Sequence, residues 1–358
     1  MNITFLVGNG FDISAGIDTS YGGFYKWYCS PSKDGNEEKL KWVKEFKRAI
    51  QEDMERPAAE RTWSDFESGL GEYIGKFDTE TAYQFIECYE DAVASLQQYI
   101  ELQMKEKVQS VSEGQKAAFS KGLLTFTDEL PDTSKENMKS MLPPKIKEDV
   151  WFGFVSFNYT SVLDKFVQEA SEIPLARWTS GATYYARVHL PVLHVHGSVD
   201  NMPLMGVNDL TQIHNSILRD NAEVQQCMVK PIASAAVGTL VQQRAKEWIR
   251  ESKIICLWGL SLGETDAHWW EEIMEWLVRD KSHQLIVFWH TGETMTRRLH
   301  TKFLKAHEKI YGKLFRYSSY ANEDIEEAKK QIHIVFDTQK VLRVSLPDKE
   351  KELMGVNP

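Results

Sequence analysis

The stretch from Thr4 to Ile17 constrains the fold of this chain more than any other part of the sequence. Its apolar run is short enough for one buried strand, and it leads directly into Gly8, Gly10 and the first turn of a helix. Glycine accepts positive φ and lets backbone N–H groups approach a phosphate at a helix start. The stretch therefore predicts a nucleotide-binding βα unit. A tight turn without ligand is the alternative, because Ile13 stands where the dinucleotide fingerprint has its third glycine.

The residues around this turn resemble two known families. Gly8, Gly10 and Ser14-Ala15-Gly16-Ile17 keep the register of the sirtuin-type NAD-binding loop. The loop and the following Thr19-Ser20-Tyr21 resemble the AbiH abortive-infection family of bacterial anti-phage proteins, whose members carry a sirtuin-like core. The P-D-F-R segment of sirtuins is missing, so the contacts of its Asp and Arg are not carried over. The resemblance implies that NAD is bound here by Gly8, Asn9, Gly10, Phe11, Asp12 and Gly16.

Charge and composition exclude several classes of protein. The 358 residues include 42 basic and 52 acidic side chains, and this formal net charge of −10 gives no strong signal for nucleic acid as the main partner. No apolar run approaches the roughly 20 residues of a membrane helix, and the first residues lack the basic start of a signal peptide. We therefore expect a cytoplasmic protein without membrane association. Four scattered cysteines form no C-x-x-C pair, so neither a disulfide framework nor the zinc module of deacetylase sirtuins is expected.

Further strand-like runs alternate with helical patterns along the chain, at 150–157, 191–196, 254–258, 284–289 and 332–336. They predict an α/β protein with a Rossmann-like, mostly parallel, doubly wound sheet, which the resemblance makes sirtuin-like. We expect residues 1–30 and 150–346 to form this discontinuous core. Residues 31–149 have helical periodicity and predict a helical insertion, and 347–358 predict a loose C-terminal tail.

One segment of the insertion stands out, Trp63-Ser64-Asp65-Phe66-Glu67. Ser64 followed three residues later by Glu67 is a capping-box signature, which predicts that a helix starts here. The segment also resembles a W-S-D-F-E element of the AbiH family, so the alternative is that it forms a wall of the ligand pocket.

Asn158 is the first candidate catalytic residue. It comes directly after the strand-like run at 150–157, and a polar residue at the carboxyl end of a core strand lies where open α/β sheets bind ligands. The matching sirtuin element is Q-N-I-D, which implies that Asn158 contacts the nicotinamide ribose and positions the reacting water. Thr160 replaces the Asp of that element, so the contacts of that carboxylate are not carried over. The alternative is that Asn158 caps the following helix.

His196 is the second candidate. His194 and His196 lie two residues apart in a strand-like run, which predicts that they share one face. They are either a metal pair, for which two histidines alone are weak evidence, or His196 matches the sirtuin L-H-G histidine and acts as a general base beside the ribose. An unperturbed pKa of about 6.5 suits histidine to that task.

The stretch Gly259-Leu260-Ser261-Leu262-Gly263 follows the strand-like run at 254–258. It fits the G-x-S-x-G nucleophile elbow of hydrolases, but no later Asp and His in a recognisable element complete a triad. It also matches the G-T-S-L element of sirtuins. That match implies that Gly259, Ser261 and Leu262 contact the ribose or phosphates on the adenine side, and we prefer it because it also accounts for the first glycine turn and for Asn158.

Together these motifs predict hydrolysis of NAD⁺ to nicotinamide and ADP-ribose, with Asn158 and His196 as catalytic residues and NAD as the substrate. No metal is expected, because departing nicotinamide is neutral. The resemblance implies a role in bacterial abortive infection, with a phage-derived trigger, and it is compatible with a homo-oligomer. Two other classes stay open. One is a nucleotide-binding sensor or regulatory subunit that does not cleave its ligand, and the other is a metal-dependent nuclease or phosphoesterase using His194, His196 and Asp266.

Overall fold

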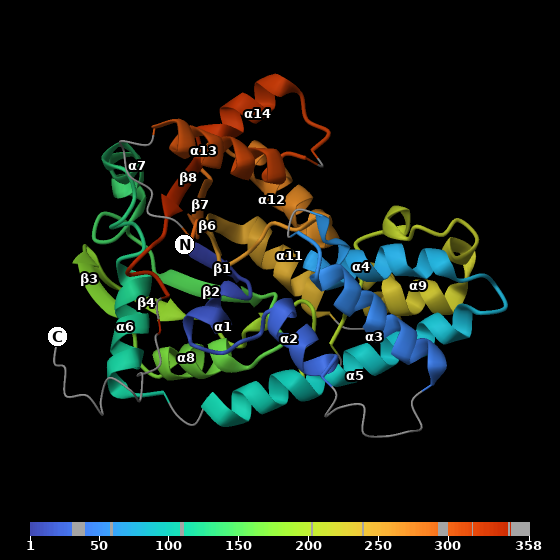
Figure 1. The fold of residues 1–358 in the computed structure, drawn as a ribbon. Coiled ribbons are helices and arrows are strands. Elements are labelled where there is room, and N and C mark those ends of the chain that lie inside the picture. Colours follow the sequence, from blue (N-terminus) through green and yellow to red (C-terminus); the bar gives the residue numbers. More distant parts are fainter. Residues whose placement is uncertain are drawn as a thin grey trace.

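The computed structural model of this chain describes residues 1–30, 40–57, 60–107, 111–201, 203–237, 240–292, 300–316, 318–342 and 344, so the predicted tail at 347–358 lies outside the described residues. Within these ranges eight strands form one sheet in the order β3-β4-β2-β1-β6-β7-β8, with β5 paired to β2 (Figure 1). The strands are β1 (Asn2–Val7), β2 (Val150–Ser156), β3 (Ala176–Ser180), β4 (Ala182–Val188), β5 (Leu193–His194), β6 (Ser252–Trp258), β7 (Gln284–Trp289) and β8 (Ile332–Phe336).

Neighbouring strands of this sheet are parallel, except for β3 and β4, which form an antiparallel hairpin. The predicted α/β class and the mostly parallel sheet are confirmed, whereas the sirtuin-like character of the core stays a prediction. The hairpin was not predicted. The run at 191–196 is also shorter as a strand than predicted, because pairing with β2 stops at His194.

The helices are α1 (Gly10–Ser14), α2 (Tyr21–Tyr28), α3 (Lys41–Met54), α4 (Phe66–Tyr73), α5 (Ala82–Lys107), α6 (Glu113–Leu124), α7 (Asp132–Met138), α8 (Val162–Ser171), α9 (Ala222–Met228), α10 (Lys230–Val237), α11 (Val241–Glu251), α12 (Ala267–Arg279), α13 (His300–Leu314) and α14 (Asn322–Lys329). No helix in the described part of the chain is both long and apolar enough to cross a membrane.

The central strand β1 is apolar at Ile3 and from Phe5 to Val7 because both faces of the sheet are covered, and its buried Thr4 hydroxyl is paired with that of Ser252. Ile3, Phe5 and Val7 point into one core, which α6 and α8 close with Phe119 and Phe166. Leu6 points into the opposite core, where side chains of α11, α12 and α13 pack. A continuous apolar run, rather than strict alternation, is what a strand buried on both faces requires.

A third core lies beside the sheet and belongs mainly to the predicted insertion. It joins aromatic side chains of α2, α3, α4 and α5, such as Phe24, Phe46 and Phe66, to Val224 and Met228 of α9. Figure 1 shows α3, α4 and α9 gathered at the right of the sheet. The helices α6 and α7, although within the same predicted insertion, place Phe119 and Met138 in the core against the sheet. The described parts of the segment 31–149 therefore pack in two places.

The fold sets one edge of the sheet apart from the rest. After β1 the chain adds β2 on one side of that strand, and it returns much later with β6 on the other side. The carboxyl ends of β2, β1 and β6 consequently lie next to each other where the direction of winding reverses, which is the place where open α/β sheets form ligand crevices.

Candidate functional site

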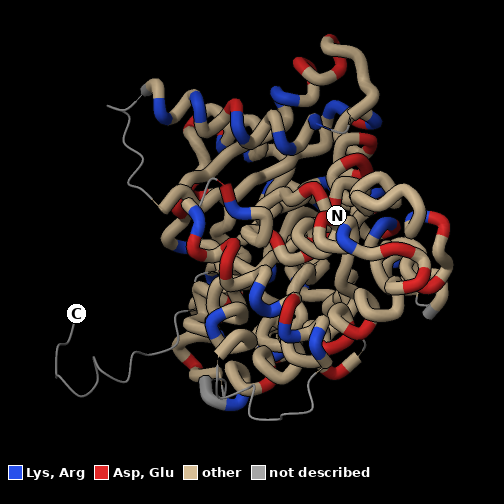
Figure 2. The backbone as a smooth tube through the Cα atoms, turned by 45° about the vertical axis from the view of Figure 1, so that its right-hand side comes forward, with Lys and Arg blue, Asp and Glu red and all other residues tan. Residues whose placement is uncertain are grey.

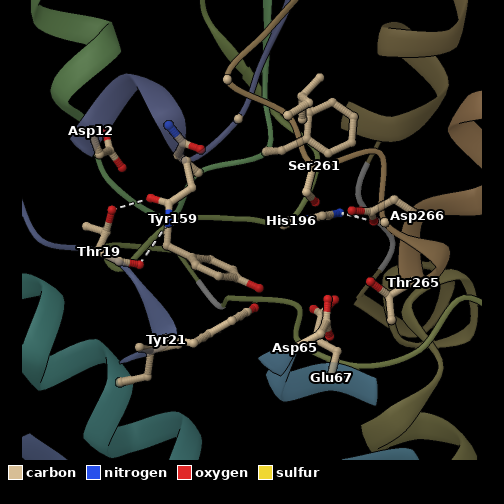
Figure 3. A pocket seen from close by; sticks show the side chains of 18 of the residues that line it. Asp12, Thr19, Tyr21, Asp65, Glu67, Tyr159, His196, Ser261, Thr265 and Asp266 are labelled. Atoms are coloured by element: carbon tan, nitrogen blue, oxygen red, sulfur yellow. Dashed lines mark hydrogen bonds and ion pairs between the residues drawn. The ribbon is translucent and has the colours of Figure 1, made fainter. Parts of the chain in front are cut away.

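A cavity of about 430 Å³ lies at the carboxyl ends of β1, β2 and β6 (Figure 3). The segments that follow these three strands supply its floor, and the start of α2, two residues of α5, the 64–67 segment and Lys313 of α13 close it from other sides. Seven of the predicted site residues line it, namely Gly8, Asn9, Asp12, Asn158, His196, Gly259 and Ser261. The structure therefore brings together motifs that are about 250 positions apart in the sequence.

The two glycine turns pack directly against each other below this cavity. Gly8 N–H donates to the carbonyl of Trp258 and Gly10 N–H to that of Gly259, both at 2.9 Å. A Cβ on Gly10 would lie 2.6 Å from the Cα of Gly259, which itself has a φ of +65°. These glycines are thus required by the contact between the turns. The expectation that the turn offers its N–H groups to a phosphate is wrong for Gly8, Gly10 and Phe11, since Phe11 N–H donates to Gly8 O.

The other four predicted site residues do not line the cavity. Gly10 lies in the contact between the turns, and Phe11 is buried edge-on against Trp258 and Phe166. Gly16 has a φ of +85° just after α1, so its role is to end that helix. Leu262 is buried and has its backbone in the left-handed region. The structure gives these four residues packing and backbone roles.

Asp12 and Asn158 are buried at the cavity with unmet hydrogen-bonding capacity. By hydrogen-bond geometry, both amide atoms of Asn158, which is 4 % exposed, and Oδ2 of Asp12 have no partner among the described residues, although the Asn158 amide lies close enough to Asp12 to lower the pKa of that carboxyl. Thr160 donates its hydroxyl to Oδ1 of Asp12 at 2.8 Å. Burial raises the pKa of Asp12 to about 7. The side chain of Asn158 caps no helix, because Ser161 is the N-cap residue of α8.

The two histidines have different partners, and β5 ends at His194, so the strand alternation from which the spacing predicts a shared face does not extend to His196. His194 lies between Asp164 Oδ2, 2.9 Å from its Nε2, and the backbone carbonyl of Asn158, 3.1 Å from its Nδ1. Burial opposes protonation of His194, but the hydrogen bond to Asp164 raises its pKa. His196 instead lies beyond β5, with Nε2 2.9 Å from Oδ1 of Asp266. The described residues contain no group of three side chains arranged to hold a metal.

His196 belongs to a buried chain of charges, of which the sequence patterns indicated only Asp266, as a ligand of the alternative metal site, and neither Lys230 nor Glu67. The Lys230 ammonium donates to Asp266 Oδ1 and to Glu67 Oε2, each at 2.8 Å. Figure 3 shows Glu67, Asp266 and His196 around the same side of the cavity. Burial alone would raise the pKa of Asp266, but Lys230 and then His196 lower it below its usual range. Burial raises the pKa of Glu67.

The segment Trp63–Glu67 has a different function from the predicted capping box. Asp65, not Ser64, is the N-cap residue of α4, and it accepts a hydrogen bond from Ser68 N–H at 3.0 Å. Glu67 turns away from the helix start and accepts from Lys230 and from Gly206 N–H. The alternative interpretation of this segment as a wall of the pocket is the one that the geometry favours, because Ser64, Asp65 and Glu67 all line the cavity.

The segment Met205–Asp209 places Lys230. Val207 N–H donates to Met228 O, and Lys230 N–H donates to Val207 O, so this segment runs beside the start of α10. A Cβ on Gly206 would lie 2.0 Å from Met228 O, which leaves room for glycine alone. Asn208 accepts from His268 N–H on α12, the helix that follows Asp266. The segment thereby ties α4, α10 and α12 together.

The cavity is more acidic than the molecule as a whole. Asp12, Asp65, Glu67 and Asp266 line it, whereas Figure 2 shows acidic and basic residues interspersed along the rest of the chain. At the mouth, Lys313 donates to the backbone carbonyl of Ser261 at 2.8 Å, and burial lowers the pKa of this lysine. The cavity therefore combines a carboxylate-rich interior with a cation beside the second glycine turn.

A family model described as bacteriophage abortive infection AbiH matches residues 4–289, which is more than half of the chain. The matched range includes every cavity residue named above except Lys313. No curated protein matches the chain.

Proposed function

Since this chain belongs to the bacteriophage abortive infection family AbiH, we propose that it acts in anti-phage defence by hydrolysing NAD⁺ to nicotinamide and ADP-ribose. The reaction takes place in the cavity at the ends of β1, β2 and β6. The observation that carries this proposal is the Asn158 amide, buried at the cavity with neither atom paired. An unpaired buried amide is destabilising, and a ligand that supplies both a donor and an acceptor removes the penalty.

The charges of the cavity suit the chemistry of this bond. The pyridinium ring of NAD⁺ is positive, and the ribose acquires positive charge as the glycosidic bond breaks. Fixed negative charge stabilises such developing charge where water is excluded, and the two carboxylates Glu67 and Asp266, which share the single ammonium of Lys230, supply it here. The pyrophosphate then lies toward the mouth, where Lys313 provides a positive charge. The side chains of Asn9 and Ser261, rather than the N–H groups of the first turn, contact the rest of the dinucleotide.

His196 is the general base of the proposed reaction. The electron pair of the glycosidic bond leaves with the ring nitrogen and neutralises nicotinamide, water forms the new bond to the ribose carbon, and His196 accepts the proton of that water. Asn158 orients the ribose and the water. A positioned base contributes about 10²–10⁴-fold to a rate.

The test is incubation of purified protein with NAD⁺ and EDTA, with nicotinamide and ADP-ribose followed by chromatography. We expect His196→Ala and Asn158→Ala each to lower turnover at least about a hundredfold. His333→Ala is the matched control, because His333 is as buried as His196, at 5 %, but contacts Gln284 far from the cavity. Unchanged turnover in both cavity variants would show that the site is assigned wrongly.

A nucleotide-binding sensor is the second candidate. The unpaired Asn158 amide favours it equally, because this amide can bind a nucleotide that is not cleaved. It predicts stoichiometric binding of NAD⁺ or ADP-ribose by the wild type with no product. A binding titration on the sample used for turnover separates the two functions. Activity that is lost in EDTA and restored by Mn²⁺ would instead support a metal-dependent nuclease or phosphoesterase, although His194 faces Asp164 and not Asp266.

A further inference from the structure

We propose that Lys230 and Asp266 are positioning residues that hold His196 in a single tautomer, with the proton on Nε2 and Nδ1 free to accept a proton. One oxygen carries the argument. Oδ1 of Asp266 accepts the Lys230 ammonium at 2.8 Å and lies 2.9 Å from Nε2 of His196, a close ionic contact that is not aligned as a hydrogen bond. The negative charge beside Nε2 favours the tautomer with N–H at that nitrogen.

The burial of Lys230 indicates that it serves more than stability. Its side chain is 1 % exposed and lies between two carboxylates, Glu67 and Asp266. Taking such charges out of water is costly, and apolar residues of similar volume often stabilise a protein as well or better. Here an apolar residue in place of Lys230 would leave Asp266 next to His196 but without the ammonium that now holds its carboxylate. The lysine therefore fixes where the carboxylate lies.

Glu67 completes the arrangement from the side of the insertion. It accepts both the Lys230 ammonium and Gly206 N–H, so Lys230 is held between α4 and the turn before α12. The ring of His196 is further confined by Phe157, edge-on at 5.2 Å. Because Nε2 lies 2.9 Å from Asp266 Oδ1, Nδ1 is the nitrogen left for the water of the proposed reaction. A second histidine, His268, lies near Asp266 but does not act as the base for this water. Burial lowers the pKa of His268 to about 3, and its Nδ1 contacts Asn208.

The tautomer of His196 is measured directly by long-range ¹H–¹⁵N spectra of the full-length protein labelled at histidine, with the His196 signals assigned from His196→Gln. We expect the Nε2–H tautomer in the wild type and a mixture in Lys230→Met, which keeps the length of the side chain without its charge. Lys230→Arg restores the wild-type pattern in part. Arg250→Met is the matched control, since it breaks an ion pair with the buried Glu272 away from the cavity.

Asp266→Asn provides a second route if Lys230→Met does not fold, because it removes the charge beside Nε2 at a partly exposed position. It is expected to give the same mixture of tautomers. Unchanged His196 signals in the variants that fold, as judged by circular dichroism, would overturn the proposal.

The kinetic consequence rests on the proposed NAD⁺ hydrolysis, whereas the spectra do not. In an active enzyme Lys230→Met lowers kcat at least tenfold and leaves KM within about twofold, because the lysine does not touch the substrate. A wild type without turnover but with the expected tautomer change would refute the hydrolase and keep the positioning role. Turnover in the wild type, together with a His196 tautomer that no variant alters, would support the hydrolase and refute the positioning role.

Discussion

The unpaired amide of Asn158 gives a prediction in which stability and ligand binding change in opposite directions. Asn158→Ala removes two polar atoms that have no hydrogen-bond partner in the described structure. We therefore expect the variant to be as stable as the wild type or more stable, although a buried residue is truncated. Binding of NAD⁺ should be lost at the same time, since the amide is the group proposed to meet the ligand.

The expected gain in the free energy of unfolding of Asn158→Ala follows from the two unpaired amide atoms that it removes. A buried polar atom without a partner costs about 1–3 kcal/mol. Because the site opens into a cavity that water can enter, the lower end applies, and we expect a gain of at most about 2 kcal/mol in the free energy of unfolding. Truncation beside an existing cavity creates little new void, so the usual penalty for a large-to-small change in a core is small here.

Asn215 is the matched control. Its Nδ2 donates to the carbonyls of Ile74 and Phe77, and its Oδ1 accepts from the N–H groups of Ile217 and Leu218. At about 1 kcal/mol for each bond, Asn215→Ala should lower the free energy of unfolding by about 2–4 kcal/mol.

The assay is urea unfolding followed by tryptophan fluorescence, with and without NAD⁺. At a hundred times its dissociation constant, a ligand stabilises the wild type by about 2.7 kcal/mol, and the Asn158→Ala variant should gain almost nothing. If Asn158→Ala is destabilised as much as Asn215→Ala, then its amide is satisfied in the free protein and the argument for a ligand at this place fails.

Further predictions concern Asp12 and the glycine turns. Because burial raises the pKa of Asp12 from 3.8 to about 7, its ionisation destabilises the fold progressively as the pH rises between these values. Asp12→Asn should remove up to about 4 kcal/mol of that loss. If the free energy of unfolding of the wild type, measured with urea, changed with pH as steeply at pH 8 as at pH 5, this expectation would be contradicted. Thr160→Val removes the hydroxyl that lowers this pKa, so the midpoint of the same loss should move to higher pH. Gly10→Ala should lower the free energy of unfolding by about 1–3 kcal/mol, since its Cβ would meet backbone at 2.6 Å. Gly312→Ala, in a helix with open space around it, should raise the free energy of unfolding by about 0.5–1 kcal/mol; similar melting temperatures for these two variants would refute the packing argument.

Local sequence patterns predicted the elements that carry the cavity. A buried strand followed by a glycine turn was recognisable at β1, and Asn158 was recognisable as a polar residue at the end of β2. The pattern works because strand burial, turn chemistry and the direction of parallel strands are all short-range properties. The same patterns could not tell that Gly10 and Gly259 face each other, because both interpretations, phosphate binding and close packing, call for the same residue.

The tertiary structure alone decided which charges meet at His196. Lys230 interrupts an apolar run just before Pro231, and nothing nearby identifies its partners. These lie 163 positions earlier, at Glu67, and 36 positions later, at Asp266. The capping-box signature at Ser64 was wrong for a related reason, because a buried ammonium attracts Glu67 more strongly than the N–H groups of a helix start do. The sequence by itself determined β1, β2, β6, β7 and β8, the glycine turns after β1 and β6, and the edge of the sheet where a site forms, whereas the β3–β4 hairpin was not predicted. The pairing of distant charges depends on how three separate cores pack together. The hydrophobic periodicity within a single segment does not predict that arrangement.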